Sequence, residues 1–425
     1  MMPRCCMRFK VKYLLLSAVL IFLLDFFGVF IHMFELDYYR LFSYPLNGDV
    51  LHYAHQLRFH QEPDVQPINI YNYTFSKECA SKCIEEGAPV SPQLVFLVKS
   101  AMKNFNRRSA IRKSWGYERR FSDVTIRTVF LLGISDNREL QKHIDIESDQ
   151  YSDIVQANFV DTYFNNTIKT MMGFQWAVRF CPRSRFYMFV DDDFYISAKN
   201  VLRFVRNPAK YPDYLAEADE TLRKLARKLN QSDFRNGTPN AQFLKEAHQV
   251  VIQGASSFDN KRHFHRIEEF VNKHNRPRTF NNGSRVKRHI MDMELPSDAK
   301  LFAGFVFVSS PHRHRSSKWH VTLSEYPFHL WPPYVTAGAF IVSREALFEM
   351  YFTSMFTKHF RFDDIYLGIV ALKARIEPLH CKEFYFHKAP YTGPQSYRYV
   401  VASHGYDNSE ELIKVWTEAR AAGHA

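Results

Sequence analysis

The chain has 425 residues, of which 46% are hydrophobic and 24% charged, and its formal net charge is +12. This composition is typical of a folded protein and excludes a chain that is disordered over most of its length. The positive charge suits nucleic acid, an anionic membrane surface or a phosphate-bearing small molecule, and composition alone does not choose among these partners.

An apolar segment near the N-terminus narrows the choice. Residues 13–31 form a run about as long as a bilayer core requires, with one charged residue, Asp25, inside it. Basic residues precede the run and acidic residues follow it, so the positive-inside rule predicts a cytosolic tail (1–12), a transmembrane signal-anchor (13–31) and a luminal body. The chain is therefore expected to be a single-pass type II membrane protein. A cleaved signal peptide is the alternative, but the run is long for one and no small-x-small cleavage site follows it.

Glycosylation triplets and cysteines in the expected luminal part agree with this orientation. The five N-x-S/T acceptors are Asn72, Asn165, Asn230, Asn236 and Asn282. An oxidising lumen allows three pairings of the four cysteines there, which are Cys79, Cys83, Cys181 and Cys381. Half a zinc site at the first two is disfavoured, because no second ligand pair has suitable spacing. A luminal body also excludes nucleic acid as a partner.

The segment after the apolar run predicts a stem followed by an α/β domain. Residues 32–92 contain five prolines and no sustained period, which is typical of an irregular spacer. From residue 93, apolar strands expected at 94–101, 125–133, 153–161 and 186–193 alternate with helical segments. This alternation predicts a three-layer α/β domain over 93–425 with a largely parallel sheet, whose ligands bind beyond the carboxyl ends of the strands.

A polar segment interrupts that pattern at about 207–300. It is rich in Asn, Lys, Arg and His and carries three of the five glycosylation triplets, so we expect a surface insertion. Apolar patterning resumes at 301–310 and 331–343, and a last helix is expected at 410–420.

Three adjacent carboxylates form the strongest single signal. Asp191, Asp192 and Asp193 directly follow the apolar strand FYMFV, at the edge of the sheet where ligands are expected. Adjacent carboxylates raise one another's pKa unless a cation lies among them, and hard oxygen ligands suit Mg²⁺ or Mn²⁺ bridged to substrate phosphates. A solvated acidic turn is the alternative for an isolated triplet.

Two further clusters carry candidate chemistry. In RRSAIRKSWG, Arg108 and Arg112 are four residues apart and share a helix face, where they could hold a phosphate or a base; a solvated basic face is the alternative. In FRFDDIYLG, Asp363 and Asp364 lie between bulky apolar residues. Desolvation should raise the pKa of at least one of them and suit it to accept a proton from a sugar hydroxyl, although an aspartate capping the following helix would look the same.

Six motifs in fixed order resemble the metazoan β-1,3-glycosyltransferase family. They are RRSAIRKSWG, VFLLG, DIVQANFVDTYFNNTIKT, FYMFVDDDFYIS, WPPYVTAGAFIVS and RFDDIYLG. The similarity runs from about residue 93 to the C-terminus, interrupted by the insertion. EYPFHLWPPYVTAGAFI and FRFDDIYLGIVALKA are most similar to the brainiac-type β-1,3-N-acetylglucosaminyltransferases.

The resemblance implies a GT-A (Rossmann-like) fold, a Mn²⁺ cofactor and a UDP-sugar donor. It implies that Asp193, Asp191 and the C-terminal histidine His404 bind the metal. His387 is the alternative candidate for the histidine ligand. It implies a catalytic base at Asp364, beside Asp363 where the family usually has glutamate. The positions implied to face the donor are Arg108, Arg112, Lys169, Asp191, Asp192 and Gly338.

The expected activity is an inverting transfer of N-acetylglucosamine from UDP-N-acetylglucosamine to the 3-hydroxyl of a glycoconjugate, a mannosyl glycosphingolipid, at the Golgi membrane. A β-1,3-galactosyltransferase using UDP-galactose is the alternative within the same class. A non-catalytic luminal binding or partner protein is the alternative of another class, and the carboxylate clusters argue against it because a binding module needs no base.

Overall fold

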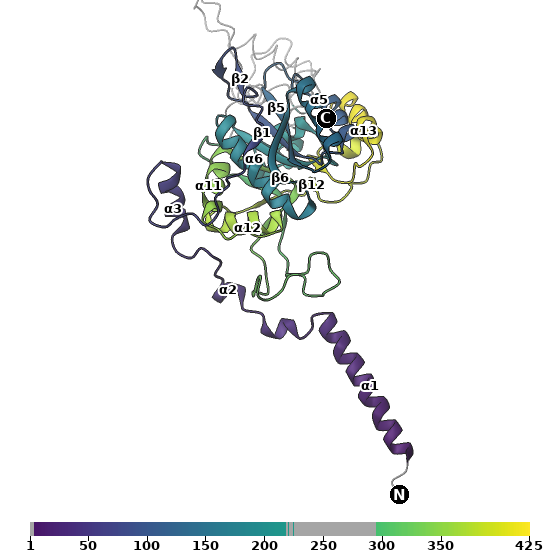
Figure 1. Cartoon of the computed structure of the whole chain (residues 1–425). Coiled ribbons are helices and arrows are strands. Elements are labelled where there is room, and N and C mark those ends of the chain that lie inside the picture. Colours follow the sequence, from purple (N-terminus) through teal and green to yellow (C-terminus); the bar gives the residue numbers. More distant parts are fainter. Residues whose placement is uncertain (1–3, 218–219, 221–223, 225–294) are drawn as a thin grey trace, which may run out of the picture.

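The computed structural model describes residues 4–217, 220, 224 and 295–425 (Figure 1). The predicted glycosylation sites Asn230, Asn236 and Asn282 lie outside these residues. A central sheet of eight strands has the order β1-β6-β5-β4-β7-β10-β9-β11. Its strands are β1 (Phe75–Lys77), β4 (Leu94–Lys99), β5 (Ile126–Ile134), β6 (Ile154–Val160), β7 (Phe186–Asp191), β9 (Phe302–Phe307), β10 (Tyr334–Ser343) and β11 (Leu379–His380).

The sheet is mixed, with a parallel centre. Strands β6, β5, β4 and β7 run parallel, as the sequence predicts, while β10 is antiparallel to both β7 and β9, and β1 is antiparallel to β6. The α/β class is therefore confirmed, and the four predicted strands of the first half are present within a few residues of their expected ends. All six residues of β4 are buried, which explains why its sequence is an apolar run and does not alternate.

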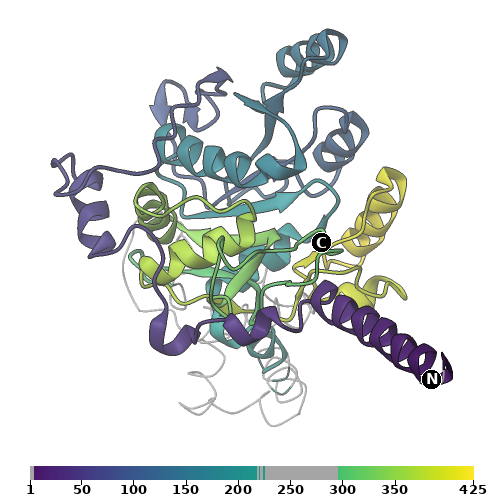
Figure 2. The ribbon, with the colours of Figure 1, turned by 60° about the horizontal axis from the view of Figure 1, so that its bottom comes forward.

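Helices cover both faces of the sheet (Figure 2). The helices of the domain are α4 (Phe105–Lys113), α5 (Arg138–Tyr151), α6 (Asn166–Phe180), α7 (Ala198–Arg206), α11 (Arg344–Met355), α12 (Asp363–Lys373) and α13 (Ser409–Ala421). One apolar core joins the sheet to α6, α11 and α12, and the other joins it to α4, α7 and α13. Val95 and Leu97 of β4 enter the first core and Phe96 enters the second, as the period of two requires.

Smaller elements complete the fold. A three-stranded sheet has the order β12-β13-β8, from β12 (Phe384–Tyr385), β13 (Ala402–Ser403) and β8 (Tyr195–Ile196), and β2 (Ile84–Glu85) pairs with β3 (Ala88–Pro89). The 3-10 turns are η1 (Ile31–Phe34), η2 (Tyr163–Asn165), η3 (Pro208–Lys210) and η7 (Pro394–Tyr397). The small sheet ties the segment after the aspartate triplet to the C-terminal part of the chain.

The N-terminal segment differs from the predicted anchor in its bounds. Helix α1 (Arg4–Phe26) begins before the apolar run and ends five residues before residue 31. It projects from the body of the protein (Figure 1). In the part of the chain that the structure describes, no helix combines the length and apolar character needed to cross a membrane.

The predicted stem is packed against the domain. It forms α2 (Tyr38–Leu41) and α3 (Val50–Arg58), and α3 lies along α11, where Arg58 Nη2 is 2.7 Å from Glu345 Oε2. Further on, Tyr71 Oη lies 3.0 Å from Tyr366 Oη, so the chain before β4 covers the α11–α12 face. The prolines therefore mark an irregular path over a surface, which sequence periodicity cannot distinguish from a free spacer.

The predicted insertion also begins later than expected. Tyr211, Tyr214 and Leu215 are buried in the core beside α7, so the core includes residues past the expected start of the insertion at about 207. Tyr214 Oη donates to the carbonyl of Arg203 at 2.7 Å, which fixes this extension.

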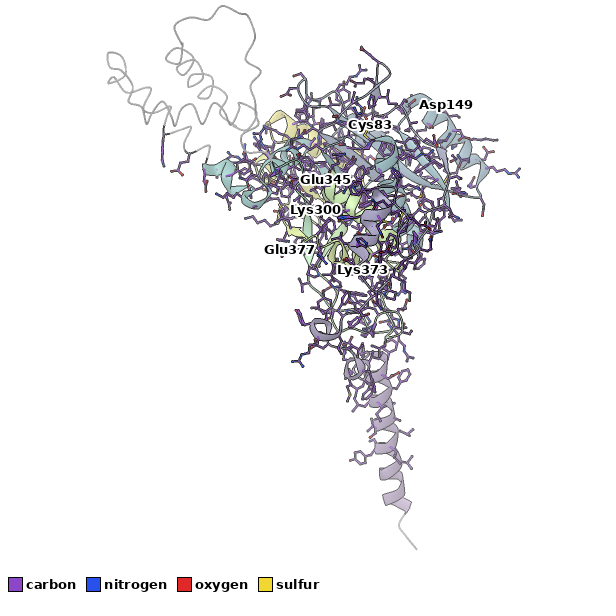
Figure 3. All side chains as sticks on the ribbon, turned by 90° about the vertical axis from the view of Figure 1, so that its left-hand side faces the viewer. Cys83, Asp149, Lys300, Glu345, Lys373 and Glu377 are labelled. Carbon is purple, nitrogen blue, oxygen red and sulfur yellow. A yellow bond between two sulfur atoms is a disulfide. The ribbon has the colours of Figure 1, made fainter. Side chains whose placement is uncertain are left out.

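One disulfide is present, between Cys83 and Cys181, whose Cα atoms are 5.4 Å apart. It is one of the two bonds in one of the three pairings that the sequence left open, and the bond that would complete that pairing, Cys79–Cys381, is not formed. Cys79 donates its thiol to the carbonyl of Ile154 at 2.9 Å, and Cys381 is buried. In Figure 3, Cys83 lies at the end of the body far from α1.

Candidate active site

A buried lysine organises the edge of the sheet where the carboxylates gather. Lys99, the last residue of β4, is paired in register with Asp191, the last residue of β7. Its Nζ atom lies 3.0 Å from Asp191 Oδ1 and 3.0 Å from Asp363 Oδ2, and it donates to the carbonyl of Ala337 at 2.8 Å. Burial alone would lower the pKa of Lys99, but the two carboxylates outweigh it and raise this pKa. Lys99 is therefore a fixed cation that joins three strands and α12.

The two aspartates that begin α12 have different surroundings. Asp363 Oδ2 accepts from Lys99, from Asn166 Nδ2 at 3.2 Å and from Thr170 Oγ1 at 3.0 Å. Among the described residues, Asp364 Oδ1 accepts one hydrogen bond, from the backbone N–H of Ile365 at 2.8 Å. Burial, followed by the neighbouring charge of Asp363, raises the pKa of Asp364 to about 7. Asp363 is thus held in place, and Asp364 is the carboxylate poised to exchange a proton near neutral pH.

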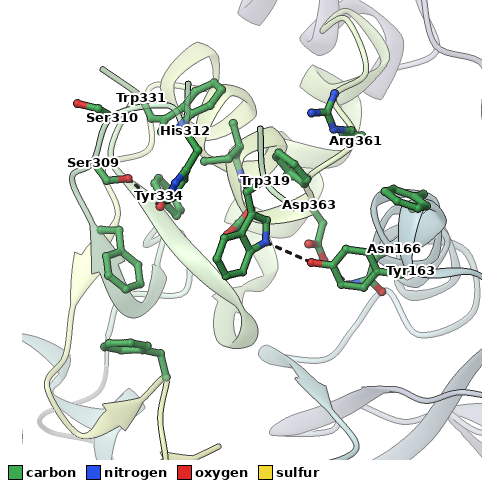
Figure 4. Close-up of a pocket in the computed structure, with 16 residues that line it drawn as sticks. Tyr163, Asn166, Ser309, Ser310, His312, Trp319, Trp331, Tyr334, Arg361 and Asp363 are labelled. Atoms are coloured by element: carbon green, nitrogen blue, oxygen red, sulfur yellow. Dashed lines mark hydrogen bonds between the residues drawn. The ribbon is translucent and has the colours of Figure 1, made fainter. Parts of the chain in front are cut away.

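Asp364 lies at a cavity of about 430 Å³ (Figure 4). Its walls come from α12, from η2, from the end of β9 and from the segment that follows β9. Aromatic side chains dominate these walls, including Tyr163, Trp319, Trp331 and Tyr334. Such rings pack well against the apolar faces of sugars while leaving hydroxyls free to hydrogen-bond. The cavity therefore suits a saccharide placed with one hydroxyl near Asp364.

The three aspartates of the triplet have different hydrogen-bond and ion-pair partners. Asp191 pairs with Lys99, and burial raises its pKa to about 6. Asp192 is buried and accepts from Ser100 Oγ at 2.6 Å, Asn104 Nδ2 at 2.9 Å and Arg107 Nη1 at 2.8 Å. Asp192 thus fixes the loop after β4 and offers little to a ligand.

Asp193 is the member with an unused oxygen. Its Oδ2 lies 3.3 Å from Nε2 of His404, while its buried Oδ1 has no hydrogen-bond partner among the described residues. Burial would raise the pKa of Asp193, but hydrogen bonding to His404 outweighs it and lowers this pKa. The same hydrogen bond raises the pKa of His404. A carboxylate and an imidazole side by side, with one carboxylate oxygen unsatisfied, fit a divalent cation.

The predicted set of three metal ligands is not assembled as a group. Within the described ranges, no three His, Cys, Asp or Glu side chains converge as a metal-binding cluster. The reason is that Asp191 is engaged by Lys99, whereas Asp193 and His404 face each other. The rival His387 is exposed and packs against the rings of Tyr385 and Phe386.

The structure does not bring Arg108, Arg112 and Lys169 to the cavity. Arg108 is fully buried, and its five N–H groups are donated to Glu147 and to acceptors in the loop after β4. Arg112 is occupied by Asp153 and Glu147. The buried Lys169 lies 2.6 Å from Asp161 Oδ1 and donates to the carbonyl of Ser100. Carboxylates and backbone carbonyls engage these cations, which position the loop after β4.

A second, basic cavity lies on the other side of Asp192. It has a volume of about 790 Å³ and is lined by α4, by the residues before it and by the start of α13, with Lys103, Arg107 and Lys113 among its residues. Arg107 bridges Asp192 to Asp407 at the start of α13. Arg107 is therefore the arginine of the sequence motif that lies at a cavity.

Gly338 allows β10 to approach the aspartate triplet closely. A Cβ atom added there would lie 2.8 Å from the ring of Phe194 and 3.6 Å from Asp191 Oδ2. A side chain at this position would displace that ring or fill the space beside the carboxylate.

The two described glycosylation triplets differ in accessibility. Asn72 is exposed. Asn165 donates its side-chain amide to the carbonyl of Val160, and the threonine of its triplet, Thr167, is buried and donates to the carbonyl of Phe360. In the folded protein, only Asn72 of this pair offers a free amide to a glycan.

Sequence reasoning missed Lys99, Asn166 and Thr170. The signal for Lys99 was present, because a lone lysine closes the otherwise apolar run LVFLVK at a strand end. Asn166 and Thr170 are polar residues at positions i and i+4 of α6 and so share a face. Nothing in the local sequence indicates that this face meets α12.

Comparisons with known proteins find relatives that match most of the chain. The family model described as Galactosyltransferase matches residues 106–230 and 284–382, and the gap between them falls in the predicted insertion. The Drosophila melanogaster β-1,3-galactosyltransferase brn is 38% identical over 411 residues, which cover 97% of this chain and 96% of that protein. The Mus musculus β-1,3-galactosyltransferase 1 is 24% identical over 84% of this chain and 82% of that protein. The Homo sapiens β-1,3-galactosyltransferase 5 is 27% identical over 76% and 77%, respectively.

Proposed function

Because this chain belongs to the galactosyltransferase family of UDP-sugar-dependent β-1,3-glycosyltransferases, we propose that it transfers N-acetylglucosamine from UDP-N-acetylglucosamine to the 3-hydroxyl of a mannosyl glycosphingolipid. The observation that carries the proposal is Asp364, a carboxylate with a pKa raised to about 7 by burial, at the aromatic-walled cavity. A general base is most effective when its pKa lies near the working pH.

The proposed mechanism is a single displacement at the anomeric carbon. Asp364 accepts the proton of the acceptor 3-hydroxyl while that oxygen attacks, and the UDP–sugar bond breaks on the opposite face, which inverts the configuration. Asp363, held by Lys99, Asn166 and Thr170, fixes the start of α12 and so the position of Asp364.

The donor diphosphate is proposed to lie between Asp193 and the basic cavity. Lys103, Arg107 and Lys113 supply positive charge there. Asp193 and His404 would hold a divalent cation such as Mn²⁺, which when bound supplies positive charge for the departing diphosphate. Asp191, which pairs with Lys99, and the neighbouring Gly338 are also proposed to face the donor.

The proposed location is the Golgi membrane, with the domain in the lumen. Helix α1 exposes Leu14, Leu15, Leu20 and Phe22, which water would not favour. The Cys83–Cys181 disulfide suits an oxidising compartment. We propose that residues 13–31 form the anchor of a type II protein and that Asn72 carries a glycan.

A galactosyl donor is the second candidate, and it is favoured by the names of the relatives, which are β-1,3-galactosyltransferases. The test uses the full chain in detergent with Mn²⁺ and either UDP-N-acetylglucosamine or UDP-galactose, and with β-mannosyl, β-galactosyl and β-N-acetylglucosaminyl glycosides as acceptors. Mass and linkage analysis of a β-1,3-linked N-acetylhexosamine on mannose would support the proposal. Hexose transfer would select the second candidate, and absence of transfer from both donors, with UDP still bound, would favour a binding protein.

A further inference from the structure

The end of α1 is joined directly to the segment that walls the saccharide cavity. Arg315 Nη2 lies 3.3 Å from Asp25 Oδ2, and the backbone N–H of Arg315 donates to the carbonyl of Phe26 at 3.4 Å. Arg313 is fully buried, with its Nε atom 2.7 Å from Glu35 Oε1. Asp25, the one charge within the apolar run, therefore points to the segment that follows β9.

The connection continues through the backbone. Leu36 N–H donates to the carbonyl of Pro327 at 2.9 Å, and His329 N–H donates to the carbonyl of Leu36 at 3.1 Å. In Figure 1 the loop that follows β9 extends from the body toward the end of α1. The segment 308–331 thus lies at the end of the molecule from which the exposed apolar helix projects.

Exposed aromatic and basic side chains gather on this segment and on η2 beside it. We call five residues at the mouth of this cavity the rim: Tyr163, Phe164, Val308, Lys318 and Trp319. Three of them, Tyr163, Phe164 and Trp319, line the cavity, and Val308 and Lys318 are each next in sequence to a lining residue. Trp319 Nε1 donates to Tyr163 Oη at 3.3 Å (Figure 4), and Lys318 Nζ lies 4.3 Å from the centre of the Trp319 ring. Phe164 is 65% exposed, Val308 64% and Trp319 44%, so the rim presents apolar surface to its surroundings.

We propose that the rim rests in the interfacial region of a lipid bilayer, so that the acceptor sugar enters the cavity from its own membrane. The inference rests on the proposed function, because it takes the cavity as the acceptor site. Tyr and Trp prefer the membrane–water interface, and Lys beside them suits anionic headgroups. Segment 312–320 carries five basic or histidine side chains besides Lys318, of which Arg313 is buried, and no acidic one. Arg315, three residues before Lys318, pairs with Asp25 near the end of α1, so the segment that carries Lys318 and Trp319 is held to that helix.

Tryptophan fluorescence provides a direct test. The chain has five tryptophans, and the other four, Trp115, Trp176, Trp331 and Trp416, are buried. The full chain is placed in phosphatidylcholine–phosphatidylserine vesicles with brominated acyl chains, which quench nearby indoles, and is compared with Trp319→Phe. We expect brominated lipid to quench a component of the emission that Trp319→Phe lacks. Equal fractional quenching of the two proteins would overturn the proposal.

Activity provides a second test with a matched control. Val308→Asp places a charge in the rim, and Ile146→Asp places one on α5 at a side chain that is 65% exposed. Each protein is assayed with a glycolipid in vesicles and with a water-soluble glycoside of the same sugar. We expect Val308→Asp to lower transfer to the glycolipid about tenfold relative to the soluble acceptor, and Ile146→Asp to leave the ratio unchanged.

The outcomes separate the two proposals. An unchanged ratio in Val308→Asp, or an equal loss on both acceptors, would reject the bilayer as the partner of the rim. Absence of transfer to any acceptor in the unmodified protein would reject the proposed function, whereas lipid quenching of Trp319 would still test the rim.

Discussion

Asp363 and Asp364 are chemically identical neighbours with different tasks. Lys99, Asn166 and Thr170 satisfy one oxygen of Asp363, whereas Asp364 has one backbone donor and a raised pKa. Asp364→Asn keeps the size and shape of the side chain but removes the carboxylate that would act as the base. We expect turnover to fall by about 10²–10⁴-fold with UDP affinity unchanged, measured by product formation and calorimetry. Lost UDP binding in this variant would instead assign Asp364 a structural role.

The pH dependence follows from the same residue. Asp364 must lose its proton to act as a base, so kcat/KM should rise with pH and level off above about 7. Its pKa is higher in the folded than in the unfolded chain, so its contribution to stability is present at low pH and is lost as pH rises through 7. Asp364→Asn should therefore melt at a higher temperature than the unmodified protein at pH 8, and the difference should shrink at pH 5. A pH-independent difference would contradict this account.

His404 and His387 form a natural pair of variants. His404 faces Asp193 at 3.3 Å, while His387 is exposed. His404→Ala should weaken Mn²⁺-dependent UDP binding by about 10–100-fold, measured by titration calorimetry with and without the cation. His387→Ala is the control and should leave binding unchanged. A larger loss of binding in His387→Ala than in His404→Ala would instead place the cation beside His387.

At the scale of elements, Lys99 connects β4, β7, β10 and α12 through one buried ammonium. Lys99→Met leaves Asp191 and Asp363 close together without their cation. We expect a loss of roughly 3 kcal/mol in the free energy of unfolding, measured by urea denaturation. Lys142→Met is the control, because its pair with Glu139 is exposed and should contribute within about 0.5 kcal/mol. Equal effects would show that the buried network is not what holds these elements together.

The sequence predicts the elements that local pattern specifies. Apolar runs ending in polar residues locate β4, β5, β6 and β7, and they place the aspartate triplet at the right edge of the sheet. The contact between α6 and α12 could not be predicted, because it depends on how helices pack over the sheet. Gly173 shows why, since a Cβ atom there would lie 2.7 Å from both Leu131 and Phe189, a fit that only the assembled layers reveal.

The arginines show the limit of reasoning from charge. Arg108 and Arg112 share a helix face as predicted, and that face meets Glu147 and Asp153. Those partners lie on α5 and before β6, between 35 and 41 residues further along the chain. Motif spacing predicts that two arginines share a helix face but not which residues that face contacts. The more exposed Arg107 is the arginine of the motif that lines the basic cavity.

At the scale of the whole molecule, residues 25–71 form part of the folded body. Glu35 neutralises the buried Arg313, which also donates to the carbonyls of Val321, Tyr326 and Phe328. A protein shortened to begin at residue 44 loses that carboxylate and should melt about 5 °C or more below one that begins at residue 30, measured by calorimetry. Equal melting temperatures would show that the carbonyls alone are enough for Arg313.

The Cys83–Cys181 bond joins two cysteines that are both translated well before Asp364. It encloses β4, α4, β5, α5, β6 and α6, which form a continuous stretch of chain. Asp364 is translated 183 residues after Cys181, which at 5–20 residues per second is a delay of roughly 10–40 s. The ring can therefore close while the ribosome is still producing the remainder. In the folded protein β7 pairs with β4 of this ring and β10 pairs with β7, so the part of the chain that carries Asp364 packs on a covalently closed unit.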